Sequence, residues 1–162
     1  MGTLVDTTVF IQLEKELRKA PPARALAEIA NRLARELGGE EEVAIAAITA
    51  SELLHGVHRA DLAHLPRRAA FVEATLRAFP VIAFDLLCAR AHAQLWAHLA
   101  RSGADVGAHD RLVAATAIAM GWRVATANVR HYQHITGLDV VNPDLSRSST
   151  AEAIPPRRSQ GK

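Results

Sequence analysis

Cysteine pairs are missing from this chain of 162 residues, whose one cysteine is Cys88. Without a second thiol no internal disulfide can form, and Cys88 lies in an apolar helical pattern, so we expect a small core residue rather than a nucleophile. No apolar run approaches the roughly 20 residues of a membrane helix. The N-terminus also lacks the basic start, long apolar stretch and cleavage site of a signal peptide. These absences predict a protein of the reducing cytoplasm that makes no membrane contact.

Aromatic residues make up only 4% of the chain, and its formal net charge is +2. The scarcity of aromatics argues against base stacking as the main mode of nucleic-acid binding. The small net charge does not demand a polyanionic partner, although scattered arginines could still form a local basic rim. The candidates for that rim are Arg59, Arg67, Arg68, Arg111, Arg123 and Arg130.

What the sequence does contain is a regular alternation of short apolar strands and helical patterns, with 49% apolar residues. Strands are predicted at 3–6, 43–48, 81–84, 122–126 and 138–141. Helical patterns fill the intervals at about 9–17, 22–37, 49–59, 66–79, 86–103 and 109–120, with a short turn or helix at 128–134. This alternation predicts an α/β fold with three layers, α/β/α, around a central parallel sheet of four to five strands.

Local signals divide these elements and set the domain limits. Asp85 is a favourable N-cap residue for the long Ala-rich helix, and Gly103 and Gly121 are typical of helix C-termini. Gly38-Gly39 should likewise stop the second helix. One domain is predicted over residues 1–144, followed by a flexible tail over 145–162 that is rich in Ser, Pro and Arg.

Four polar residues fall where the strands of such a sheet would end, which is where ligands bind in parallel α/β folds. Asp6 ends the first strand, and Glu52 follows the second. Asp110 begins the helix that leads to the fourth strand, and Asn128 comes directly after that strand. Although they are far apart in sequence, all four can face the same end of the sheet.

Each of the four also has an architectural interpretation. Asp6 could merely cap the following helix, and Glu52 could be the third residue of a capping box begun by Thr49. Asp110 would be stabilised by the dipole of its helix, and Asn128 would be an ordinary turn residue.

Taken together, the carboxylates favour a functional site. Three carboxylates at one sheet edge repel one another unless a cation lies between them. An oxygen-only ligand set suits Mg²⁺ or Mn²⁺, and such a site can activate water and shield a phosphodiester during in-line attack. The pattern therefore predicts metal-dependent phosphodiester chemistry.

Other polar residues near these positions carry weaker signals. Thr7 and Thr126 are expected to hydrogen-bond a carboxylate or a metal-bound water. His109, His131 and His134 lie near the predicted mouth of the site and could contact phosphate. His55 and His58 are three residues apart on one helix face and could together bind Zn²⁺. Because the sequence offers no third ligand, we expect them to lie on a solvent-exposed helix face instead. The stripe of Leu95, Trp96 and Leu99 is expected to be core or a dimer face.

Four segments resemble one known family, in the right order and over about residues 3–142. They are "LVDTTVF", "ITASELLHGV", "VGAHDRLVAATAIAMGWRVATANVRHY" and "GLDVVNP", and they resemble PIN-domain ribonucleases. The resemblance is strongest to the VapC toxins of type II toxin–antitoxin pairs. It implies a PIN-like nuclease domain over 1–144 that hydrolyses RNA through a metal-activated water.

The resemblance also implies roles and partners. Asp6, Glu52 and Asp110 would bind Mg²⁺ or Mn²⁺, with Asn128 as a further catalytic residue. The family often places a fourth acid where Asn128 stands, so this chain brings no charge there, which bears on a second metal ion. A homodimer is implied, inhibited by a VapB-like antitoxin over the active-site groove and able to join a larger toxin–antitoxin assembly.

Two alternatives remain at this stage. A catalytically weak PIN domain would bind RNA or a protein without cutting it, and the neutral Asn128 leaves room for that interpretation. A phosphotransferase of the haloacid dehalogenase type would use Asp6 as a nucleophile, but it needs a second Asp where this chain has Thr8.

Overall fold

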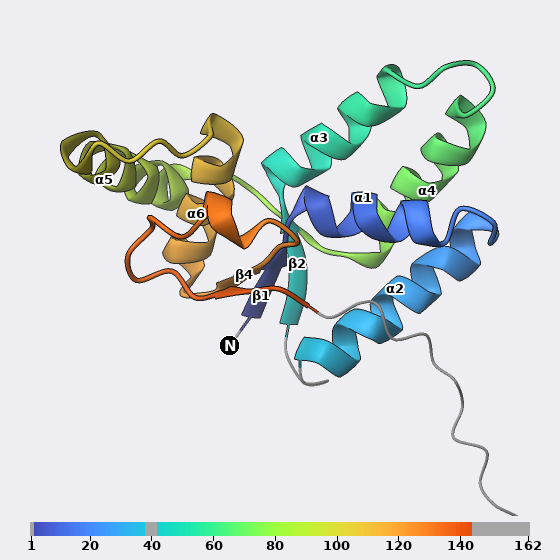
Figure 1. Ribbon diagram of the computed structural model, residues 1–162, viewed down its shortest axis with the longest axis horizontal. Coiled ribbons are helices and arrows are strands. Elements are labelled where there is room, and N and C mark those ends of the chain that lie inside the picture. Colours follow the sequence, from blue (N-terminus) through green and yellow to red (C-terminus); the bar gives the residue numbers. More distant parts are fainter. Residues whose placement is uncertain (1, 38–41, 144–162) are drawn as a thin grey trace, which may run out of the picture.

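The computed structural model describes residues 2–37 and 42–143, which form a parallel five-stranded sheet with helices on both faces (Figure 1). The strands are β1 (Gly2–Val5), β2 (Glu42–Ala46), β3 (Val81–Ile82), β4 (Arg123–Ala125) and β5 (Val140–Val141). They lie in the order β3-β2-β1-β4-β5, and all four pairings are parallel. The carboxyl ends of all the strands therefore share one edge, with β1 in the centre.

Helices connect these strands in the described part of the chain. They are α1 (Thr7–Glu16), α2 (Pro22–Leu37), α3 (Ala47–His58), α4 (Leu65–Ala78), α5 (Leu86–Ser102) and α6 (Ala108–Met120), with a 3₁₀ turn, η1 (Val129–His131), after β4. No described helix combines the length and the hydropathy that a membrane span requires.

The helices cover the sheet in two sets, each over its own hydrophobic core. Successive residues of a strand point to opposite faces, so Val5 of β1 packs in the core beneath α1–α4, while its neighbour Leu4 packs in the core beneath α5 and α6. Phe10 and Phe79 meet edge to face in the first core, with ring centroids 5.4 Å apart, a favoured aromatic geometry. The predicted α/β class, its parallel sheet and its three layers are confirmed.

The boundary between β2 and α3 differs from the prediction. The apolar run of residues 43–48 was expected to be strand throughout, but β2 ends at Ala46 and α3 begins at Ala47. An apolar run of this length does not by itself distinguish strand from buried helix. Because Ala46 caps α3, Thr49 lies inside the helix, and the capping box of Thr49 and Glu52 predicted as an alternative is wrong.

Other element ends agree more closely with the sequence signals. The Asp85 carboxylate accepts a hydrogen bond from the Cys88 amide (3.0 Å) at the start of α5. Gly103 and Gly121 end α5 and α6 with φ of 68° and 66°, a left-handed conformation that glycine adopts without strain. The predicted Gly38-Gly39 stop, the domain limit at 144 and the tail over 145–162 lie outside the described residues.

Candidate active site

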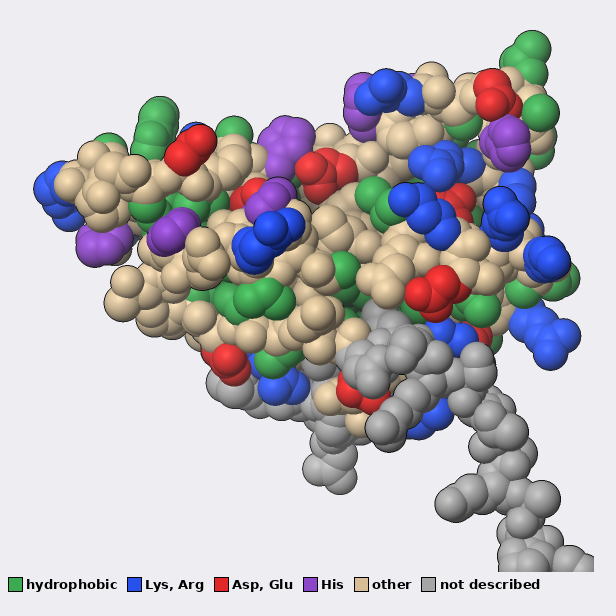
Figure 2. Space-filling model, viewed as in Figure 1, with side chains coloured by type: hydrophobic (Ala, Val, Ile, Leu, Met, Phe, Trp, Pro, Cys, Tyr) green, Lys and Arg blue, Asp and Glu red, His purple; other side chains and the backbone are tan. Residues whose placement is uncertain are grey.

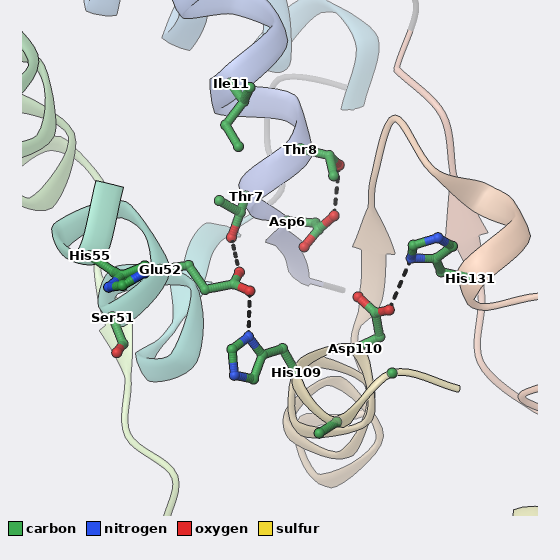
Figure 3. Close-up of a pocket in the computed structure, with 12 residues that line it drawn as sticks. Asp6, Thr7, Thr8, Ile11, Ser51, Glu52, His55, His109, Asp110 and His131 are labelled. Atoms are coloured by element: carbon green, nitrogen blue, oxygen red, sulfur yellow. Dashed lines mark hydrogen bonds and ion pairs between the residues drawn. The ribbon is translucent and has the colours of Figure 1, made fainter. Parts of the chain in front are cut away.

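The three predicted acids line one cavity of about 840 Å³ at the carboxyl end of the sheet (Figure 3). Asp6 comes from the end of β1, Glu52 from the second turn of α3 and Asp110 from the first turn of α6. The topology explains the meeting, because strands β1 and β2 are neighbours and α6 leads into β4 on the other side of β1. Asn128 and Thr126 lie nearby but do not line the cavity.

Asp6 is the most deeply buried of the three, with 4% of its surface exposed. It occupies the N-cap position of α1, yet its side chain makes no cap hydrogen bond. Instead its Oδ2 accepts hydrogen bonds from the Thr8 hydroxyl (2.7 Å) and from the Thr126 hydroxyl (2.8 Å). The predicted capping role is therefore wrong for this side chain, which two hydroxyls hold toward the cavity.

Glu52 joins three elements through its two carboxylate oxygens. The Thr7 hydroxyl of α1 donates to Oε2, and the His109 ring of α6 contacts Oε1 through Nδ1 at 2.6 Å. Thr7 was expected to hydrogen-bond a carboxylate or a metal-bound water, and the carboxylate of Glu52 is its partner.

Asp110 is held by a chain of side chains from η1. Nδ1 of His131 lies 3.0 Å from Asp110 Oδ2, and Nε2 of the same ring lies 2.7 Å from the Asn128 amide nitrogen. Asn128 therefore contacts the site through His131. Gly107 leaves space for the carboxylate, because a Cβ on it would stand 2.9 Å from Asp110 Oδ2.

Burial and the negative charge of the cavity raise the pKa values of two nearby groups, Asp110 and Tyr132. Burial raises the pKa of the Asp110 carboxyl, and the charges of Asp6 and Glu52 raise it further, while His131 partly offsets the shift. Burial, followed by the charges of the same carboxylates, raises the pKa of Tyr132. The Tyr132 hydroxyl is buried and makes no hydrogen bond within the described residues. Sequence reasoning gave no signal for this tyrosine.

The carboxylates of the cavity form a donor set of the kind that binds a hard cation. Mutual repulsion among three carboxylates is what a divalent cation would relieve, and the oxygen-rich wall suits Mg²⁺ or Mn²⁺. However, no group of three or more His, Cys, Asp or Glu side chains within residues 2–37 and 42–143 is placed to hold a metal ion as it stands. The chemistry of these residues nevertheless fits a hard cation, which Asp6, Glu52 and Asp110 would hold.

Several other predicted residues lie away from the cavity or serve the fold. His55 lines the cavity, but His58 and His134 do not. Leu95 and Leu99 are core residues, whereas Trp96 is 55% exposed.

None of the six arginines named as candidates for a local basic rim lines the cavity. Arg67 donates to backbone carbonyls at the end of α1, Arg111 to the Val106 carbonyl, and Arg123 to the Thr3 hydroxyl.

Comparison with known proteins agrees with this geometry. The family model for the PIN domain matches residues 3–136. The VapC ribonuclease Y4jK of Sinorhizobium fredii is 36% identical over 150 residues, covering 86% of this chain and 96% of the relative. Ribonuclease VapC1 of Rickettsia felis is 28% identical over 142 residues, covering 87% of this chain and 96% of that protein.

Solved structures share the fold. The DNA-bound VapBC complex of Salmonella typhimurium contains a chain that superposes with a TM-score of 0.69 at 29% identity, covering 87% of this chain and 97% of that one. FitAcB of Neisseria gonorrhoeae gives a TM-score of 0.67 at 26% identity, with the same coverage. By its family match, its relatives and its topology, the chain belongs to the PIN-domain family and, within it, to the VapC ribonucleases.

Proposed function

We propose that this protein is a metal-dependent endoribonuclease that hydrolyses RNA phosphodiester bonds and acts as the toxin of a type II toxin–antitoxin pair. The observation that carries the proposal is the convergence of Asp6, Glu52 and Asp110 on one cavity, from three elements that are distant in sequence. The ribonuclease names of relatives that align over most of the chain support the same reaction class.

The three carboxylates would hold Mg²⁺ or Mn²⁺, and the bound ion would supply Lewis-acid polarisation of the phosphate and a more nucleophilic water. Thr8 and Thr126 fix the orientation of the Asp6 carboxylate. The surrounding negative charge repels a phosphodiester, so activity should depend strictly on the cation.

His109 and His131 each place Nδ1 against a carboxylate oxygen, of Glu52 and Asp110 respectively. These rings hold the two more exposed acids in place. Asn128 orients the His131 ring through its amide.

Two protein partners belong to the proposal. A VapB-like antitoxin would cover the cavity, which is consistent with solved neighbours that are VapBC and FitAcB complexes. A second copy of the chain would cover the apolar side chains of α5, where Leu86, Leu87 and Trp96 are 67%, 56% and 55% exposed. Sedimentation of the wild type beside Leu87→Glu tests the dimer, and we expect a monomer for the variant.

The experiment that tests the activity is cleavage of total RNA by purified protein free of antitoxin, with Mg²⁺, with Mn²⁺ and with EDTA. Asp6→Ala is the test variant, and Asp139→Ala, which removes an exposed carboxylate ahead of β5, is the matched control. Discrete fragments are expected from the wild type and the control in either metal. Cleavage by Asp6→Ala, or cleavage in EDTA, would refute the proposed mechanism.

A second candidate function is a catalytically weak PIN domain that binds RNA or a protein. The neutral Asn128, which does not line the cavity, favours it. Intact RNA in every lane, from folded protein that still binds RNA or an antitoxin, would favour this module over the nuclease.

A further inference from the structure

A second hollow, of about 200 Å³, lies at the C-terminal end of α1, away from the catalytic cavity. Four of its six lining residues are Lys or Arg, and Figure 2 shows such side chains gathered over the region of α1 and α4. We call it the basic hollow, and it is lined by Glu14, Lys15, Arg18, His64, Arg67 and Arg68.

The catalytic cavity and the basic hollow share one face of α1. Thr7 and Ile11 line the cavity, and Glu14 and Arg18 line the basic hollow. Thr7, Ile11 and Glu14 are spaced by four and three residues, which places them on a single stripe of the helix. Arg18 follows two residues after α1 ends at Glu16. Since a helix of this length spans about 15 Å, the basic hollow lies roughly that far from the carboxylate at the N-terminus of α1.

The walls opposite α1 come from α3 and α4, which are consecutive helices in the chain. Glu52 and His55 of α3 face the cavity, and α4, which packs against α3, contributes Arg67 and Arg68 to the basic hollow. Along this side both hollows lie between α1 and the α3–α4 pair, whereas α6 and η1 complete the wall of the catalytic cavity.

Two arginines of the basic hollow already bind other groups of the protein. Arg67 donates to the carbonyl oxygens of Ala20 (2.8 Å) and Leu17 (3.2 Å), where α1 ends. Arg68 pairs with Glu14 at 3.2 Å. These contacts fix the walls and neutralise the one acid of the basic hollow.

Lys15 and Arg18 remain available. Both are exposed, and neither has a hydrogen bond or an ion pair within the described ranges. Exposed cations on a preformed wall can bind phosphate, Arg through a planar fork and Lys as a point charge. The scarcity of aromatics beside them fits contacts to a backbone rather than to bases.

We propose that Lys15 and Arg18 bind phosphates of the RNA strand beyond the scissile bond, along the α1 face that begins in the catalytic cavity. This inference rests on the proposed function. The cavity is acidic and repels a polyanion, so binding of the strand must draw on cations outside it. The basic hollow provides them at a distance that an extended strand reaches within a few nucleotides.

The test compares Lys15→Gln/Arg18→Gln with Arg90→Gln/Arg101→Gln, which removes the same charge from exposed positions of α5. The probes are labelled oligouridylates, one long enough to cover both hollows and one too short. Binding is measured in EDTA at several salt concentrations, and thermal melting checks that each variant is folded. For the long probe we expect the slope of log K against log salt concentration to become less steep by about 1.4 in the Lys15/Arg18 variant. Each lost phosphate contact to a single strand contributes about 0.7 to that slope, and two contacts are lost.

The control should match the wild type with both probes, and the short probe should not distinguish the variants. Lys15→Arg/Arg18→Lys, which keeps both charges, should restore the salt dependence. In cleavage assays KM for long RNA should rise while kcat is kept.

Equal affinity and equal salt dependence for the Lys15/Arg18 variant and its control would overturn the inference. Loss of antitoxin binding with unchanged RNA binding would also overturn it, and would assign the basic hollow to an acidic protein segment. Either result leaves the proposed function intact if wild-type protein still cuts RNA with metal. Absence of cleavage by the wild type, with the salt dependence changed as expected, would instead overturn the nuclease and keep the phosphate site.

Discussion

At the scale of single residues, Asp6 is held differently from the other two acids of the cavity. It is almost fully buried, and two hydroxyls bind the same oxygen atom, whereas Glu52 and Asp110 are 28% and 21% exposed and each contacts a histidine ring. A buried carboxylate depends on its hydrogen bonds more than an exposed one, because water cannot replace a lost donor.

Thr126→Val is expected to disturb that carboxylate without changing the volume of the site. The variant loses the hydroxyl that donates to Asp6 and that accepts a hydrogen bond from the backbone N–H of Asn128. We therefore expect a loss of about 1–3 kcal/mol in the free energy of unfolding. RNA cleavage should fall about 10–100-fold, as for other residues that orient a metal ligand. Thr75→Val is the matched control, because its buried hydroxyl bonds only to the Phe71 carbonyl in α4. Urea unfolding and cleavage rates measure both, and equal activity in the two variants would contradict the role of Thr126.

Asp110→Asn tests the raised pKa of this carboxyl. Because folding raises the pKa above the ordinary 3.8, the native state binds the proton more tightly than the unfolded chain does. The contribution to stability is therefore full below about pH 3.8 and is lost as pH rises through the folded pKa. In EDTA we expect the variant to melt at a higher temperature than the wild type at neutral pH, and the difference to shrink in acid. Asp105→Asn, at an exposed position before α6, should behave like the wild type, and a constant difference at all pH values would rule out this pKa shift.

Residue types near the carboxylates were predictable, but their pairings were not. Thr7 and Thr126 were expected to bond a carboxylate or a metal-bound water, and each donates to a carboxylate. Thr8 was missed, because the turn from β1 into α1 decides which of two adjacent hydroxyls faces Asp6. The contact of His109 with Glu52 joins residues 57 positions apart, and such a distance in sequence leaves no local signal.

At the scale of elements, α5 shows how far local chemistry determines a helix. It begins at an Asp whose side chain accepts an amide hydrogen bond, and it ends at a glycine in the left-handed conformation. Both signals are local, which is why the ends of α5 could be predicted. The end of β2 could not, because the residues after it are apolar in either conformation and the packing of the sheet decides where the strand stops.

Asp85→Asn and Asp85→Ala separate the charge of the α5 cap from its hydrogen bond. Hydrogen bonding to the Cys88 amide lowers the pKa of Asp85 below 3.8. Its contribution to stability is thus present above about pH 3.8 and is lost as pH falls through the lowered folded pKa. Asn also caps helices well, so Asp85→Asn should melt like the wild type at neutral pH and lack this acid-dependent loss. Asp85→Ala should melt lower at neutral pH, and equal melting of the two variants at all pH values would contradict the cap.

At the scale of the whole molecule, the fold brings three acids to the edge where strand ends meet, and in doing so it builds in repulsion. Parallel pairing of β2, β1 and β4 fixes the position of Asp6 beside Glu52, and α6 adds Asp110 from the opposite layer. The order of strands and helices allowed the sequence to predict this meeting. It could not predict that histidine rings would hold two of the acids.

Divalent metal should therefore stabilise the whole fold if the three carboxylates bind it. A ligand that binds only the native state contributes about 2.7 kcal/mol at a hundredfold excess over Kd, which for a domain of this size raises Tm by roughly 5–10 °C. We expect this rise for the wild type in Mg²⁺ or Mn²⁺ relative to EDTA, at ionic strength matched with NaCl. Asp139→Asn should show the same rise, because its carboxylate lies outside the cavity, whereas Asp6→Asn should show little. A wild-type Tm that does not respond to either ion would mean that the convergence of acids does not bind metal, because relief of their repulsion could not occur without a gain in stability.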